Sequence, residues 1–149
     1  MPVPNGLNPT FDSINLTGTT AGTSALRTAR AIYSFATDGG AVSTITPVGT
    51  VALPDNAVIV AGTVNSTTAC TSGGAATVAV GTSAGSSTTA LLAATAVASL
   101  SLDARLNAVP SFATPVKLTA AGNVTLTIAA AALTAGVIEV TLMYYVANN

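Results

Sequence analysis

The residue types that most often carry out chemistry in proteins are scarce in this chain. Its 149 residues include no histidine and one cysteine, Cys70. Histidine is the commonest general base and metal ligand, and a serine triad of the usual kind requires it. A zinc site needs a cluster of Cys or His ligands, which one cysteine cannot supply. The composition therefore predicts no metal, no cofactor and no enzyme activity.

Carboxylates are the remaining candidates for acid–base chemistry, and they are dispersed along the chain as Asp12, Asp38, Asp55, Asp103 and Glu139. Two of them meeting in the folded chain would give a carboxylate pair and a minor hydrolase, which is the least favoured alternative. The chain contains no DxDxDG calcium-binding loop, and a calcium site built from Asp and backbone carbonyls stays an open alternative. Asp38 and Asp55 fall in turn-forming stretches, where Asp bonds to nearby backbone groups. We expect these two to be structural.

A cysteine and a glycine-rich stretch each resemble a reactive or ligand-binding group only in part. Cys70 has no cysteine partner in the chain, and we expect a small buried hydrophobic residue rather than a reactive thiol. Residues 81–88, GTSAGSST, are rich in glycine like a phosphate-binding loop but lack its lysine. We predict a surface loop there.

Arg27 and Arg30 are the one charged pair that stands out. One interpretation is a solvated surface, and the other is an anchoring contact to an acidic or carbonyl-rich partner, for which the arginine fork of donors is suited. Lys and Arg number only four in the chain. That number is too small for the basic stripe that nucleic acid requires. The sequence contains no basic amphipathic helix of the kind that would indicate membrane binding.

The overall charge is low for a protein of this length. Charged residues make up 6% of the chain and the net charge is −1, against about 25% charged residues in an ordinary domain. Hydroxyls are abundant instead, with 25 Thr and 12 Ser. Because a low net charge promotes association, we expect a chain that packs against copies of itself or against a larger surface.

Residues 124–146, VTLTIAAAALTAGVIEVTLMYYV, are long enough to cross a membrane as a helix. However, apolar residues alternate with Thr, Glu and Tyr in both halves of the stretch, which is the period of a strand. We predict an antiparallel pair of strands that reverses at Gly136. Met143 and Tyr145 would share one face of the second strand, and we interpret them as a candidate subunit interface, with edge packing inside the fold as the alternative.

Turn signals recur along the rest of the chain, at 38–40, 54–56 and 72–74, with strand-like stretches between them. The strongest strand expectation places Val58, Val60 and Val64 on one side, with a bulge or close approach at Gly62. Residues 88–95 have helical spacing with Ser87 as a cap.

The pattern as a whole predicts an all-β protein: an antiparallel β-sandwich or barrel with one short helix near 88–95. Prolines 2, 4 and 9 favour an extended N-terminal arm over residues 1–30, followed by a sandwich domain over residues 31–149. The first residues lack the basic start and apolar core of a secretory signal. We therefore expect synthesis in a cytoplasm without export.

Three stretches carry a resemblance to a known family: LPDNAVIVAGTVNSTTA, ATVAVGTSAGSSTTALLAATAVASL and TPVKLTAAGNVTLTIAAAALTAGVIEVTLMYYV. In order and spacing they resemble the capsid decoration (cement) proteins of tailed bacteriophages, from about Ile45 to Val146. The resemblance implies a jelly-roll-like sandwich, homotrimers on the capsid surface and an arm that grips the shell. The chain departs from many relatives in its low charge, which leaves the docking partner open.

If the resemblance holds, the partners are other copies of the chain and the phage major capsid protein. The chain would be made in the cytoplasm of the host bacterium and located on the virion surface. Such a protein has no catalytic residues to carry over. The alternative function is a receptor- or glycan-binding head on a phage fibre or baseplate, against which the small number of aromatic residues argues.

Overall fold

The computed structural model describes residues 25–84, 89–107 and 114–147. Strands dominate these residues, and only two short helical turns accompany them. The elements are β1 (Arg27–Ser34), α2 (Phe35–Asp38), β2 (Ser43–Ile45), β3 (Ala57–Ser72), β4 (Thr77–Thr82), β5 (Leu92–Ala96), the 3₁₀ turn η1 (Val97–Ser99), β6 (Arg105–Asn107), β7 (Val116–Lys117), β8 (Val124–Ala129) and β9 (Leu133–Val146).

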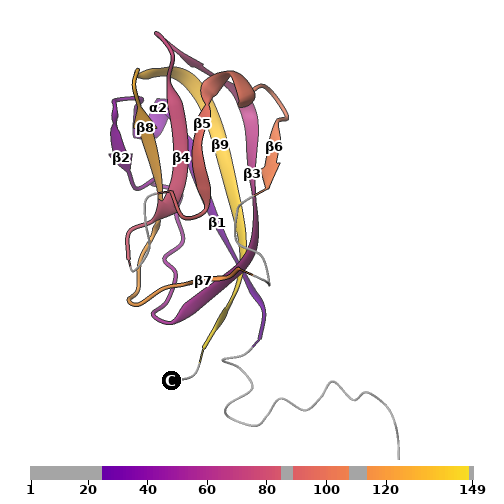
Figure 1. Ribbon diagram of the computed structural model, residues 1–149. Coiled ribbons are helices and arrows are strands. Elements are labelled where there is room, and N and C mark those ends of the chain that lie inside the picture. Colours follow the sequence, from indigo (N-terminus) through magenta and orange to yellow (C-terminus); the bar gives the residue numbers. More distant parts are fainter. Residues whose placement is uncertain (1–24, 85–88, 108–113, 148–149) are drawn as a thin grey trace, which may run out of the picture.

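The strands form two antiparallel sheets packed face to face (Figure 1). Sheet A has the order β1-β9-β3-β6, with β7 also paired to β3, and sheet B has the order β2-β8-β4-β5. One set of strand pairs corresponds to a single long hairpin: β1–β9, β2–β8, β3–β6 and β4–β5. Folding this hairpin over brings together two further pairs, β3–β9 and β4–β8. This arrangement is a jelly roll, so the predicted fold class is confirmed.

The core lies between the two sheets, and the alternation along the strands builds it. Val124, Leu126 and Ile128 of β8 are buried, as are Ile138 and the alternate residues that follow it in β9. A period of two places these side chains on one face of each strand. The largest fully buried side chains come from both sheets and the connections: Tyr33, Leu53, Ile59, Leu91, Leu100, Leu118, Leu126, Ile128, Ile138 and Leu142.

The stretch 124–146 is two strands, as predicted, but the expected pairing between them is wrong. β8 belongs to sheet B and β9 to sheet A, so the strands face each other across the core. The chain reverses between β8 and β9, where Ala130 has a φ of 68°. Gly136 lies inside β9 rather than in a turn. No helix in the described residues is long and apolar enough to span a membrane.

The register of β3 also differs from the expectation. Ile59 and Val64 belong to the core cluster, whereas Val58 and Val60 are buried outside it. The pairing with β9 shifts between Ile59 and Ala61, because an extra residue is inserted there as a β-bulge. Beyond the bulge, the residues of β3 that point into the core alternate in the opposite phase from those before it. Strict alternation placed Val58, Val60 and Val64 on one face, and that prediction is wrong.

Three further predictions from the sequence can be compared with the structure. The helix expected near 88–95 is wrong, because Leu92–Ala96 is strand β5, and the helical turns are α2 and η1. The loop expected at 81–88 begins later than predicted, since Gly81 and Thr82 are buried residues of β4. Strand β1 begins at Arg27, within the predicted arm. Residues 1–24 of that arm lie outside the described residues.

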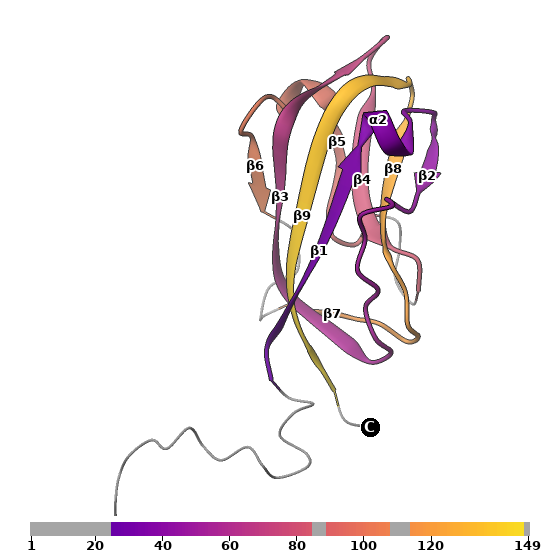
Figure 2. The same ribbon diagram turned by 180° about the vertical axis from the view of Figure 1, so that it is seen from behind.

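The described chain begins and ends at the same end of the sandwich. Figures 1 and 2 show that β1 starts beside the C-terminal end of β9. Arg27 pairs there with Tyr144 across the two strands. Any segment that precedes β1 therefore enters the fold at this end.

Candidate interaction surface

Two of the dispersed acids have the structural role that the sequence predicts. Asp38 accepts hydrogen bonds from the backbone N–H groups of Ser34 and Val48, both at 2.8 Å. Asp55 accepts one from the N–H of Asn56 at 2.7 Å. Within the part of the chain that the structure describes, no group of three or more acidic, Cys or His residues could hold a metal ion.

Cys70 lies in the core, as expected for a small hydrophobic residue. Its side chain is 7% exposed, and burial raises the pKa of its thiol. Gly136 of the neighbouring strand β9 makes room for it, because a Cβ at Gly136 would lie 2.5 Å from Cys70 Sγ. A buried thiol with a raised pKa is a poor nucleophile, so the geometry favours the structural interpretation.

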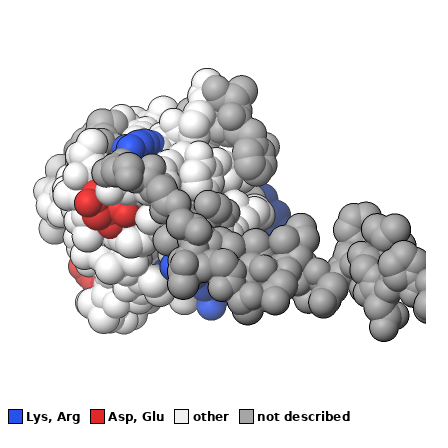
Figure 3. All heavy atoms as spheres, turned by 90° about the horizontal axis from the view of Figure 1, so that it is seen from below, with Lys and Arg blue, Asp and Glu red and all other residues white. Residues whose placement is uncertain are grey.

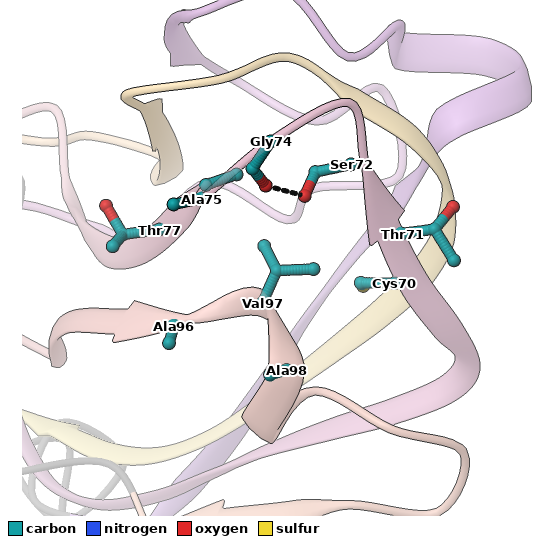
Figure 4. A pocket seen from close by; sticks show the side chains of 10 residues that line it. Cys70, Thr71, Ser72, Gly74, Ala75, Thr77, Ala96, Val97 and Ala98 are labelled. Carbon is teal, nitrogen blue, oxygen red and sulfur yellow. Dashed lines mark hydrogen bonds between the residues drawn. The ribbon is translucent and has the colours of Figure 1, made fainter.

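A shallow depression of about 440 Å³ lies beside Cys70, between the end of β3, the following turn and the β5–η1 connection (Figure 4). Figure 4 shows side chains that are small and uncharged, including Ser72, Val97 and Ala98. The hydroxyl of Ser72 is used locally, since it donates to the carbonyl oxygen of Gly74. The depression offers neither charge nor an aromatic surface to a ligand.

The outer face of sheet A is the richest candidate surface. Because alternate residues of β9 point into the core, the residues between them point outward, and the strand register extends this outward set to the neighbouring strands. Figure 2 shows sheet A in front. We define the sheet A face as Thr28, Arg30, Ile32, Val58, Ala61, Thr63, Asn65, Arg105, Lys117, Glu139, Thr141, Met143 and Tyr145.

Arg30 is held on this face by an ion pair with Glu139. Its Nε and Nη2 donate to the two carboxylate oxygens of Glu139 at 2.6 and 2.7 Å. The hydrogen bond from Arg30 is the main reason that the pKa of Glu139 lies below its ordinary value. The side chain of Arg30 remains 57% exposed. Strand pairing thus fixes the guanidinium in place without burying it.

Met143 and Tyr145 lie on the same face, near the C-terminal end of the inner strand β9. Met143 is 37% exposed and faces Thr28 of β1 and Ala61 of β3 in the register. Tyr145 faces Val58. The preceding Tyr144 points into the core, as its 7% exposure shows. Of the four residues singled out from the sequence, Arg30, Met143 and Tyr145 therefore share this face, whereas Arg27 is opposite Tyr144 in the register and lies on the other face of β1.

The structure adds two residues that sequence reasoning missed. Arg105 of β6 faces Asn65, which in turn faces Glu139, and Lys117 of β7 faces Val58. Both side chains are exposed. They are far from Arg30 in sequence, and only the order of strands in sheet A brings them to this face. No local pattern of residues could have indicated it.

Charge is divided unequally between the two sheets. All four Lys and Arg residues of the chain, Arg27, Arg30, Arg105 and Lys117, lie in strands of sheet A. The four strands of sheet B contain no charged residue. From below, the described surface is mostly uncharged, with a few separate blue and red groups (Figure 3).

Comparison with known proteins finds likeness in structure but not in sequence. No protein-family description matches the chain, and no curated protein does. A chain of the cyanophage Pam1 capsid asymmetric unit is 20% identical, with a TM-score of 0.62 over 84% of this chain and 87% of that chain.

Two other phage capsid structures contain similar chains. A chain of the acid-stable capsid of Helicobacter pylori bacteriophage KHP30 is 16% identical, with a TM-score of 0.59 over 83% of this chain and 90% of that chain. A chain of the capsid of Ralstonia phage GP4 is 20% identical, with a TM-score of 0.56 over 83% and 86%. At these identities the likeness establishes a shared fold.

Proposed function

We propose that the chain is a structural protein of a bacteriophage virion that binds the outer surface of the capsid shell and stabilises it. The observation that carries this proposal is the shared fold with chains of three phage capsid structures, over most of the length of each chain. Each match covers at least 83% of this chain and 86% of that chain.

The chemistry of the molecule suits a structural role. It has no histidine, its one thiol is buried, and Asp38, Asp55 and Glu139 are engaged in local contacts. A protein that stabilises a shell needs many contacts repeated by symmetry rather than reactive groups. Mostly neutral surfaces suit such contacts, because a charge buried at an interface without a partner is costly.

The assembly that we propose is a homotrimer, as the resemblance to cement proteins implies. Arg27 and Arg30 are the proposed anchoring residues on the shell, since both are exposed residues of β1, the strand at one end of the order of sheet A. The N-terminal arm is proposed to add to this attachment. That Met143 and Tyr145 contact another copy remains a prediction from the sequence.

The alternative of a receptor- or glycan-binding head has less support. Glycan sites use aromatic side chains beside polar ones, whereas the depression near Cys70 has no aromatic residue in its lining. The three structural neighbours are described as parts of capsids rather than of fibres.

The proposal is tested by adding the purified chain to shells that lack it. We expect saturable binding and a higher temperature of shell disruption, measured by light scattering and by release of packaged DNA. An absence of saturable binding to shells, together with binding to host cells, would favour the receptor-binding alternative instead.

A further inference from the structure

We propose that the sheet A face is the surface that docks onto the shell, and that its partner there is an acidic protein surface. This inference rests on the proposed function and deepens it. It also assigns Met143 and Tyr145 to a contact with the shell, whereas the sequence suggests a contact with a second copy of the chain.

The first argument is the placement of the cations. Arg30 lies on β1 at one edge of sheet A, and Arg105 and Lys117 lie on β6 and β7 beyond β3. Arg27 is opposite Tyr144 in the register and belongs to the other face of β1. Neighbouring strands are about 4.8 Å apart, so Arg30 is separated from the other two cations of the face by the width of β9 and β3. Positive side chains therefore border the face on both sides.

The second argument is the state of the one acid on the face. Glu139 already accepts two hydrogen bonds from Arg30, so its charge is locally compensated. An arginine has five N–H donors, and this pair leaves Arg30 with donors for another acceptor. A partner thus meets a surface on which cations outnumber acids, although the whole chain has a net charge of −1.

The third argument is the uncharged centre between the two cationic borders. Met143 and Ala61 occupy it as a facing pair, and Tyr145 lies opposite Val58, which is itself only 5% exposed. Protein interfaces have this anatomy, with Tyr, Met and Arg enriched and a polar rim around an apolar centre. Residues of the types that dominate binding energies, Tyr and Arg, are both present.

The chemistry favours an acidic protein over nucleic acid as the partner. Nucleic-acid binding depends on neutralising several backbone phosphates, about six to ten in strongly salt-dependent DNA-binding proteins, and this face has three cations, Arg30, Arg105 and Lys117. An apolar centre also has no role against a phosphate backbone. Sheet B, whose strands carry no charge, offers no electrostatic preference and is assigned to the opposite side.

The test is the double variant R105Q/K117Q, measured for binding to purified shells that lack the chain at about 0.1 M and about 1 M salt. The variant removes two exposed cations without touching the core. We expect binding about tenfold weaker than wild type at 0.1 M salt, where charges interact over about 10 Å. The difference should shrink at 1 M salt, where the screening length is about 3 Å.

Two control variants separate charge from shape. R105K/K117R keeps both charges and should bind as the wild type does. The neutral variant A93Q/A94Q changes two exposed residues of β5 on sheet B and should also bind normally. Circular dichroism and thermal unfolding of each variant confirm that the fold is intact.

The inference is overturned if R105Q/K117Q binds shells as the wild type does at 0.1 M salt, or if R105K/K117R is weakened equally. It is also overturned if duplex DNA competes with shells for the face. In all three cases wild-type binding to shells persists, so the proposed function stands. Failure of the wild-type chain to bind shells would instead overturn both proposals.

Discussion

Gly136 and Cys70 show at the residue scale how two small groups permit close packing inside the sandwich. Gly136 has a φ of 134° within strand β9, and a Cβ placed there would lie 2.9 Å from the Cα of Cys70. A side chain at this position conflicts with both its own backbone and that of β3. Glycine looks like a turn residue in the sequence, and only the strand pairing gives the physical reason for it.

Gly136→Ala should therefore lower the free energy of unfolding strongly. Strain at a glycine-only backbone conformation and overpacking each cost about 1–3 kcal/mol, and we expect a total loss of about 2–4 kcal/mol in urea denaturation. Gly73→Ala is the matched control, because a Cβ at Gly73 meets nothing within 4 Å. Equal losses for the two variants would contradict the packing argument.

Glu139 gives a prediction about pH. Its folded-state pKa is lowered from an ordinary value of 4.5, chiefly by the hydrogen bond from Arg30. The pair therefore stabilises the fold above pH 4.5, and this contribution is lost as the pH falls through the lowered pKa. The effect should be small, since exposed ion pairs contribute little.

The measurement compares the wild type with Glu139→Gln in urea denaturation from pH 7 down to about pH 2. We expect the variant to be slightly less stable at pH 7 and the difference to disappear at acidic pH, where Glu139 is neutral in both states. A stability difference that does not change with pH would show that the carboxylate charge is not the cause.

At the element scale, Asp38 ties together segments that strand pairing does not join. Its two carboxylate oxygens accept hydrogen bonds from Ser34, at the end of β1, and from Val48, beyond β2. The side chain thus fixes the crossing from sheet A to sheet B. A charged acceptor with two backbone donors is among the stronger hydrogen-bonding arrangements in proteins.

Asp38→Ala should lower the free energy of unfolding by about 1–3 kcal/mol, because it leaves backbone donors without their acceptor. Asp55→Ala removes the same charge from a turn where the carboxylate bonds only to the adjacent Asn56, and we expect a loss under about 0.5 kcal/mol. Chemical denaturation measures both. A larger loss for Asp55→Ala would reverse the assignment of the two roles.

Much of the secondary structure could be predicted at this scale, but the pairing could not. Alternation identified β8 and β9, and the signals at 54–56 and 72–74 identified the turns around β3. Local spacing failed where tertiary context decided: Leu92–Ala96 forms an edge strand of sheet B instead of a helix. The bulge near Val60 likewise left no signature in residue types.

At the scale of the whole molecule, the wrapping of the strands creates the candidate surface. Arg27 and Arg30 could be singled out from the sequence because they are close in the chain. Arg105 and Lys117 could not, because they reach the face of Arg30 only through pairing with the long strand β3. A fold class can be inferred from patterns, whereas a surface depends on the strand order.

The proposed homotrimer is tested by native mass spectrometry of the purified chain. We expect a species of three times the chain mass of 14.4 kDa, since a neutral surface favours association. Replacing Met143 and Tyr145 with Ser should leave the trimer intact while weakening attachment to shells, because we assign both residues to the shell contact. A loss of the trimer in that variant would return them to the interface between copies.

The central claim is that the chain is a capsid protein with sheet A turned toward the shell. The most direct test is a cryo-electron microscopy reconstruction of phage particles from the host that produces the chain. We predict density for the two-sheet sandwich on the outside of the shell, with β1, β9 and β3 facing an acidic surface below. Particles whose reconstruction and protein content lack this chain would contradict the account.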